Sequence, residues 1–190
     1  MPTDSAIELR SIALEQFASV GFAGASLQHI ADAAGLSKSS VLYHYGSKEA
    51  LLEAAIGPAI DRLEEILSAH PMRSASGEHG AQFVEEFIDF LLAHRLEVHT
   101  FINQGQSLQG IPVIDRANSL VRQLGASMVD ELPSTEDRIR FGVALGGAAY
   151  ILVAGANFSD VELDEHEARA ALVNVVTQLL SGVAHPPANS

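Results

Sequence analysis

Five polar side chains near the N-terminus could bind a nucleic acid. They are Lys38, Ser39, Ser40, Tyr43 and His44. On a helix that begins at Lys38, Val41 is the residue expected to be buried, and we expect these side chains to be offered outward. An ammonium group, small hydroxyls and an aromatic hydroxyl suit the phosphate oxygens and base edges of a major groove. We therefore expect this stretch to contact double-stranded DNA.

Two short helices joined by a tight turn are needed to present these side chains. Ser26 is a suitable N-cap for a helix from Leu27 to Ala34, and Ser37 is a suitable N-cap for a helix from Lys38 to about Tyr45. Gly35 stops the first of these helices. This length and turn are typical of a helix-turn-helix.

Small and apolar residues allow the pair to pack on a preceding helix, which is predicted from about residue 7 and ends at Gly21. The small residues that let two helices cross closely are Ala31, Ala34 and Gly35. The apolar residues predicted to form the shared core are Ile30, Leu36 and Val41.

The net charge restricts where DNA can bind. The chain has 11 Lys+Arg against 24 Asp+Glu, a formal net charge of -13. Taken whole, this argues against a general polyanion binder and against binding to an anionic membrane surface. However, the segment from Leu36 to Lys48 contains both lysines of the chain and no acid. We expect DNA binding on one small face, supported by helix N-termini and hydroxyls.

In several segments the turns and spacing match a known family. The matching segments are Gly21-Phe22, Ser26-Leu27-Gln28-His29-Ile30-Ala31, Ala34-Gly35-Leu36-Ser37-Lys38 and Leu42-Tyr43-His44-Tyr45-Gly46-Ser47-Lys48-Glu49-Ala50-Leu51. Over about residues 7–55 the chain resembles the DNA-binding region of tetracycline-repressor (TetR) family regulators. The resemblance implies a bacterial homodimer that binds a short palindromic operator and is released when a small molecule occupies a second domain.

The resemblance also implies roles for single residues. Lys38, Ser39 and Ser40 begin what resembles the recognition helix and would reach bases or nearby phosphates. Tyr43 and His44 match positions that commonly touch phosphate. Lys48 matches a lysine at the start of the fourth helix, where the helix N-terminus also favours a phosphate. Gln28 opens the second helix, where family members often contact the DNA backbone.

Two positions depart from the family pattern. Leu42 stands where a second aromatic residue is common, and we expect it to join the core. Gly46 stands where proline is common. Tyr45 is expected in the core from its spacing to Val41. Alternatives remain open: Tyr43 and its neighbours could be a plain surface cluster, and Lys48 could be a solvated charge.

The rest of the chain is predicted to be helical. Helices are expected from Lys48 through Leu67 with a kink or break at Gly57-Pro58, from about Phe83 to Leu92, and over 96–110, 113–132, 134–157 and 164–182. Residues 70–80 are expected to form a loop. The prediction is an all-α protein of about nine helices, with a DNA-binding domain over 1–50, a ligand-binding and dimerisation domain over 51–185 and a tail over 186–190.

Aromatic residues and scattered amides in the second domain suggest a pocket for a small, largely apolar effector. The alternative is an ordinary filled core. The predicted lining residues are Phe87, Phe90, Leu91, His94, Phe101, Ile102, Gln106 and Tyr150.

A run of small residues suggests a dimer interface. Small residues in one long helix and an apolar stripe in the last helix would let two copies pack closely around a two-fold axis. The predicted interface residues are Gly142, Gly146, Ala149, Leu172, Val176 and Leu179.

No cofactor, metal or membrane span is expected. His94 and His99 are five residues apart, about 140° around a helix, so they do not share a face. The chain has no cysteine, which excludes disulfides and thiolate chemistry and suits the cytoplasm. The uncharged run 141–158 is rich in glycine, so we expect a buried helix. The N-terminus shows no signal peptide.

The composition and motifs also bear on enzymatic function. The chain has neither a glycine-rich phosphate loop nor a G-x-S-x-G motif, so we do not expect an enzyme. Two alternatives to a regulator stay open, a helical protein-interaction module with a non-functional helix-turn-helix and, less favoured, an enzyme.

Overall fold

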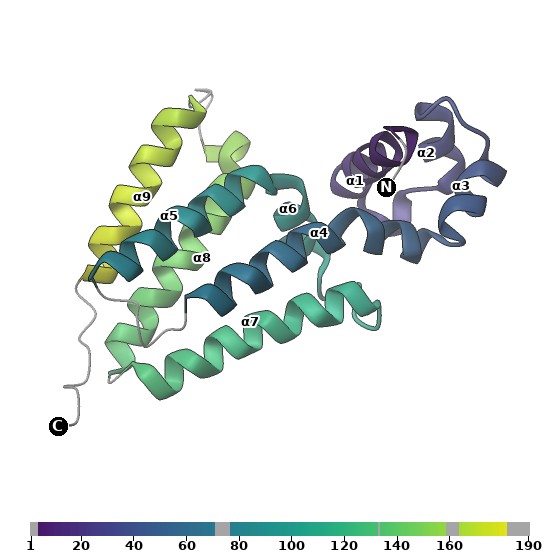
Figure 1. The fold of residues 1–190 in the computed structure, drawn as a ribbon. Helices are drawn as coiled ribbons and strands as arrows, with labels where there is room; N and C mark the ends of the chain where they lie inside the picture. The colour runs from purple at the N-terminus through teal and green to yellow at the C-terminus, as the bar shows by residue number, and fades with distance from the viewer. Residues whose placement is uncertain (1–3, 71–76, 133, 159–163, 182–190) are drawn as a thin grey trace. The chain divides into compact units, whose positions relative to one another are not determined.

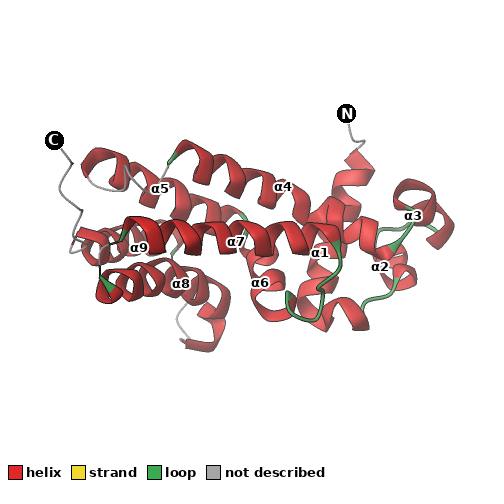
Figure 2. Ribbon diagram, turned by 90° about the horizontal axis from the view of Figure 1, so that it is seen from below, coloured by secondary structure: helices red, strands yellow, loops and turns green. Residues whose placement is uncertain are grey.

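The computed structural model describes residues 4–70, 77–132, 134–158 and 164–181. These residues form nine α-helices and contain no strand (Figures 1 and 2), which confirms the predicted all-α fold. The helices are α1 (Asp4–Gly24), α2 (Leu27–Ala33), α3 (Lys38–Tyr45), α4 (Lys48–Ala69), α5 (Gly77–Ala93), α6 (Arg95–Gln104), α7 (Pro112–Glu131), α8 (Thr135–Phe158) and α9 (Glu165–Ser181).

The chain forms two compact units. One unit comprises Met1–Asp61 and Leu96–Asn118, and the other comprises Arg62–Arg95 and Ser119–Ser190. The chain therefore leaves the first unit along α4 and returns to it along α6. The predicted functional division after residue 50 stays a prediction.

The first unit is built on α1, α2 and α3, which lie together in Figure 1. Many apolar residues of these helices and of the first half of α4 are buried, in agreement with their helical spacing. The fully buried ones include Leu9, Phe17, Ile30, Val41, Leu51, Leu52 and Ile56. This core fixes α2 and α3 to α1, so the helix pair that was predicted to bind DNA has a rigid base.

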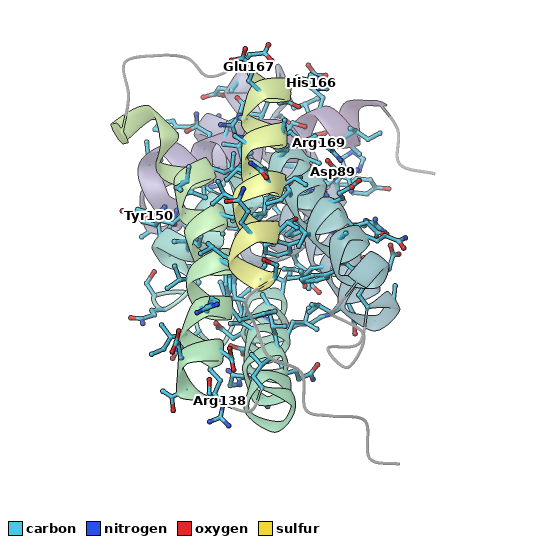
Figure 3. The ribbon with its side chains drawn as sticks, turned by 90° about the vertical axis from the view of Figure 1, so that its left-hand side faces the viewer. Asp89, Arg138, Tyr150, His166, Glu167 and Arg169 are labelled. Atoms are coloured by element: carbon cyan, nitrogen blue, oxygen red, sulfur yellow. The ribbon has the colours of Figure 1, made fainter. Side chains whose placement is uncertain are left out.

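In the second unit, α5, α8 and α9 pack side by side (Figures 1 and 3). Their shared core contains Val84, Ile88, Phe141, Leu145 and Val176. At the edge of this core, Arg169 of α9 donates through Nε and Nη2 to the carboxylate of Asp89 on α5, the second bond at 2.9 Å. Figure 3 shows these two side chains pointing toward each other.

Helix α1 is broken at Gly21. This glycine has φ +76° and ψ 157°, a conformation that L side chains rarely adopt. The prediction that the first helix ends at Gly21 is therefore correct for the regular helix. A short helical piece follows and extends to Gly24.

Helix α4 continues through Pro58, so a break at Gly57-Pro58, one of the two predicted alternatives, is wrong, and the kink stays a prediction. Apolar residues on both sides of the proline, among them Ile56, Ala59 and Ile60, are buried. Pro58 itself is exposed. Water can therefore hydrogen-bond the carbonyl that the proline leaves without an N–H partner, while the buried face keeps the helix in register.

Other predicted boundaries moved by several residues. Helix α5 begins at Gly77, inside the loop predicted over 70–80, and residues 71–76 of that loop lie outside the described residues. Helix α6 ends at Gln104 and turns follow, so the helix predicted to reach residue 110 is shorter. The predicted tail, 186–190, also lies outside the described residues. No helix in the described part is long and apolar enough to cross a membrane.

Candidate nucleic-acid interface

A glycine turn joins α2 to α3. Gly35 has φ +66°, its N–H donates to Asp32 O at 3.1 Å, and the N–H of Leu36 donates to Ala31 O at 2.8 Å. These two bonds form a Schellman motif, which satisfies the last carbonyls of α2 and reverses the chain within two residues. The turn therefore sets the angle at which α3 leaves α2.

Serine caps begin both helices of the pair, as predicted. Ser26 Oγ accepts from the His29 N–H at 3.1 Å, and Ser37 Oγ accepts from the Ser40 N–H at 3.1 Å. The Ser37 and Ser39 hydroxyls also share a hydrogen bond of 2.9 Å. Ser40 is only half-exposed. The N-terminus of α3 thus carries hydroxyls held in a fixed arrangement.

The outer side of α3 presents the other predicted DNA ligands. Lys38, Ser39, Tyr43 and His44 are exposed, and Tyr43 reaches 87%. The rings of Tyr43 and His44 meet edge to face, with centroids 5.5 Å apart. A large aromatic side chain this exposed has no role in the core of the chain, so its polar hydroxyl is available to a partner.

Gln28 lies on the exposed side of α2. Its Nε2 donates to Asp32 Oδ1 at 2.7 Å, one helical turn further along. The amide is therefore held along the helix surface and keeps one donor and its carbonyl oxygen for another partner. The predicted contact of Gln28 with the DNA backbone stays a prediction.

Tyr45 and Leu42, which were both expected in the core, differ in burial. Tyr45 is half-buried, and its hydroxyl donates to Ala6 O at 3.0 Å, which ties the end of α3 to the start of α1. The expectation that Tyr45 belongs to the core is therefore met only in part. Leu42, which was expected to join the core, is 39% exposed. That expectation is wrong because Val41, one residue earlier, takes the buried position of this helical turn.

Lys48 points back into its own unit. Its Nζ donates to Phe22 O at 2.7 Å and to Ala25 O at 3.0 Å, and it lies 4.4 Å from the centroid of the Phe22 ring. Two of its three donors are therefore used to satisfy carbonyls just before α2. These contacts give Lys48 a structural role, and its DNA contact stays a prediction.

Side chains of the chain itself also contact backbone N–H groups at the N-terminus of α4. Ser47 Oγ accepts from the Ala50 N–H at 3.1 Å. The backbone N–H of Glu49 and then the Ser47 hydroxyl stabilise the charged carboxylate, so the pKa of Glu49 is lowered. A phosphate placed here would meet this negative charge as well as the helix N-terminus.

The N-terminal region that contains this helix pair is similar to several known proteins. The family described as "Bacterial regulatory proteins, tetR family" matches residues 9–55, which contain the Ser-capped helix pair and its base. Residues 9–55 are therefore similar to the TetR family. The relatives that match in this region include RutR of Escherichia coli K12, an HTH-type transcriptional regulator that is 45% identical over 51 residues.

The sequence likeness is confined to this part of the chain. The match to RutR covers 27% of this chain and 24% of RutR. The regulatory protein RaaS of Mycobacterium tuberculosis is 50% identical over 46 residues, which cover 24% of this chain and 21% of RaaS. The alignments therefore span about a quarter of these relatives and bear on this region alone.

Solved structures show a similar fold along nearly the whole chain. A TetR-family regulator of Streptomyces coelicolor aligns with a TM-score of 0.70 at 23% identity, covering 93% of this chain and 90% of that one. The ketosteroid regulator KstR2 of M. tuberculosis aligns with a TM-score of 0.69 at 17% identity, covering 98% of both chains. The TetR-family fold therefore extends through the helices that follow the DNA-binding region.

The predicted pocket residues fall into both units. Phe87, Phe90 and Leu91 of α5 are buried in the second unit, where the Phe90 ring lies 5.2 Å from the half-buried His94 ring. Phe101, Ile102 and Gln106 belong to the first unit, and the last two are exposed. Tyr150 is 52% exposed on α8 and projects outward in Figure 3. The pocket stays a prediction.

The predicted dimer residues occupy α8 and α9. Gly142 and Gly146 are exposed with open space at the Cβ position, and Ala149, Leu172 and Leu179 are half-buried. Val176 is 2% exposed and already belongs to the core of a single chain. Beside the glycines, Ile139 and Val143 are 60% and 56% exposed. One side of α8 thus presents apolar and small residues to solvent.

Within the described ranges, no three His, Asp or Glu side chains lie close enough together to hold a metal ion.

One contact of the first unit was not predicted. The sequence pattern indicated no role for Gln104, although its side chain contacts α1 on both sides of the Gly21 break. No local pattern could have revealed this, because its partners lie 82 and 87 residues away in the chain.

Proposed function

We propose that this protein is a cytoplasmic transcriptional repressor that binds a palindromic operator as a homodimer and is released by a small, largely apolar effector. The observation that carries the proposal is the helix pair α2–α3. Its second helix, α3, exposes Lys38, Tyr43 and His44 and lies in the acid-free segment from Leu36 to Lys48. This combination suits phosphate and base contacts in a major groove.

The arrangement of charge supports specific rather than general DNA binding. The whole chain has a formal charge of -13, so the rest of the surface repels phosphates. The segment from Leu36 to Lys48, which contains α3, offers two lysines and four serine hydroxyls and contains no acid. A dimer doubles this small face, which is the reason to expect two half-sites and a palindrome.

The exposed side of α8 supports the homodimer. Ile139, Gly142, Val143 and Gly146 lie at helical spacing on this side, opposite the buried Phe141 and Leu145. Glycines without neighbours let a second helix approach closely. A second copy of α8 has the same small and apolar residues and can pack on this side around a two-fold axis.

The proposed effector has two supports. It is drawn from the family resemblance and from the aromatic row of α5, in which Phe83, Phe87 and Phe90 follow one another with ring centroids 5.8 and 6.3 Å apart. A compound that binds the native protein should raise its melting temperature and weaken operator binding together.

The deciding experiment is selection of genomic DNA fragments by the purified protein, followed by titration of the enriched fragment at several salt concentrations. The proposal expects one enriched palindromic sequence and an affinity that falls steeply with salt. A helical interaction module with a non-functional helix-turn-helix would enrich no sequence, and that result would overturn the proposal.

A further inference from the structure

A glutamine side chain bridges the break in α1. Gln104, the last residue of α6, accepts from the Phe22 N–H through Oε1 at 2.7 Å and donates to Phe17 O through Nε2 at 2.7 Å. Both contacts lie within the first compact unit. The same side chain therefore holds the residues before and after Gly21.

The break creates the groups that this side chain satisfies. A helix leaves its last four carbonyls and its first four N–H groups without partners inside the helix. Phe17 O belongs to the last turn before Gly21, and Phe22 is the first residue after it. Because Gly21 O already accepts from the Ala25 N–H at 2.9 Å, Gly21 acts as the cap of a new helical piece.

A carboxamide is suited to this position. It carries the same donor and acceptor pair as a backbone peptide group. Gln104 can therefore act as a C-cap for the first part of α1 and as an N-cap partner for the second part at once. An aliphatic side chain would remove the acceptor bound by the Phe22 N–H and a donor to Phe17 O in a half-buried place, at a cost to the arrangement.

The segment held by Gln104 leads directly into the DNA-binding helices. The Phe22 carbonyl accepts from Lys48 Nζ at 2.7 Å, and the Phe22 ring packs on Phe17 with centroids 5.3 Å apart. Ser26, the cap of α2, follows four residues after Phe22 along the chain. The direction of the chain at Phe22 thus sets where α2, the Gly35 turn and α3 begin.

We propose that Gln104 is a positioning residue for DNA binding, whose carboxamide closes the break in α1 and holds α2 and α3 in the orientation that binds the operator. The inference rests on the proposed function.

The first test replaces Gln104 with methionine, which keeps the length of the side chain and removes both hydrogen bonds. Operator affinity should fall about tenfold, equivalent to about 1.4 kcal/mol. The matched control is Gln109→Met, an exposed glutamine just beyond α6, which should bind the operator like the wild type. Equal affinity of Gln104→Met and wild type, with both folded, would overturn the proposal.

A second variant separates positioning from a general loss of stability. In Gln104→Glu the ionised carboxylate can accept from Phe22 N–H but cannot donate to Phe17 O. When protonated, it has both a donor and an acceptor. The affinity of this variant, divided by that of the wild type at the same pH, should therefore rise from pH 7.5 toward about pH 5. Lys48 is the cation that donates to the same Phe22 carbonyl, and it is present in both proteins.

A readout without DNA distinguishes the two proposals. Amide hydrogen exchange at Phe22 should be slow in the wild type and faster in Gln104→Met, because its acceptor is removed. If the wild type binds no DNA sequence, the proposed function fails even when Phe22 is protected. If the wild type binds an operator and Gln104→Glu shows no gain at low pH relative to it, the positioning role alone fails.

Discussion

The two lysines of the chain occupy different environments. Lys38 is exposed at the N-terminus of α3, whereas Lys48 is half-buried and donates to the carbonyls of Phe22 and Ala25. DNA contacts were predicted for both, for Lys38 from its place at the start of the second helix and for both lysines from the family resemblance. Their environments differ because the fold brings Phe22 and Ala25 beside Lys48 at the start of α4. No local sequence pattern contains this contact.

This difference predicts different effects of removing each charge. Lys38→Ala should lower operator affinity and reduce the slope of log K against log salt by about one unit for each lysine removed, without changing the melting temperature. Lys48→Met should lower the melting temperature, because two carbonyls lose a charged donor. An unchanged slope for Lys38→Ala, measured by fluorescence titration, would exclude Lys38 as a phosphate ligand.

The tyrosines of α3 give a second prediction at this scale. Tyr43→Ala should change the free energy of unfolding by less than about 0.5 kcal/mol, because the side chain is 87% exposed, and should weaken operator binding. Tyr45→Phe should do the reverse: it removes the bond to Ala6 O, at a cost of about 1 kcal/mol, and leaves the DNA face intact. Urea unfolding and operator titration of both variants would show whether the two effects separate.

At the scale of the elements, the features that were predicted correctly from the sequence depend on the chemistry of single residues. Ser26 and Ser37 cap their helices, and Gly35 turns the chain, because capping and left-handed backbone depend on the residue itself. The continuity of α4 through Pro58 could not be predicted, since it depends on buried neighbours. The contact of Gln104 with α1 depends in the same way on residues far apart in sequence.

The turn between α2 and α3 can be tested by its glycine. Gly35→Ala should destabilise the protein by about 1–2 kcal/mol, because a residue with a Cβ is strained at positive φ, and should weaken operator binding. Gly125→Ala is the control, because Gly125 lies in α7 with open space at its Cβ, where alanine favours a helix by up to about 1 kcal/mol. Urea unfolding should give opposite signs, and equal effects would contradict this account.

The ion pair between α5 and α9 predicts a dependence on pH. The hydrogen-bonded Arg169 guanidinium holds the pKa of Asp89 below its ordinary value. The pair therefore contributes stability above the unfolded pKa of about 3.9, and this is lost as the pH falls through the lower, folded pKa. The contribution is small because both side chains are partly exposed to solvent, which screens the pair.

Neutralising either partner tests this assignment. Asp89→Asn should be less stable than the wild type at neutral pH, and the difference should shrink as the pH falls below about 4. Arg169→Met removes the same pair from α9 and should show the same trend in unfolding free energy. A difference from the wild type that is constant with pH in both variants would contradict a role for the charge of Asp89.

For the molecule as a whole, the exposed side of α8 predicts self-association. Val143→Glu places a charge in the proposed interface and should convert a dimer to a monomer at micromolar protein, measured by light scattering. Val20→Glu is a matched control, because Val20 is exposed to the same 56% on α1. A wild-type monomer at that concentration, or a Val143→Glu dimer, would refute the interface.

The Gln104 contact can form only after much of the chain has been synthesised. Its partners lie 82 and 87 residues earlier. A ribosome that adds about 5–20 residues per second needs roughly 4–16 s to make that stretch. Throughout this interval the nascent N-terminal helices lack the side chain that closes α1. We therefore expect a newly made chain to acquire full operator affinity only after α6 has left the ribosome, although the DNA-binding helices emerge first.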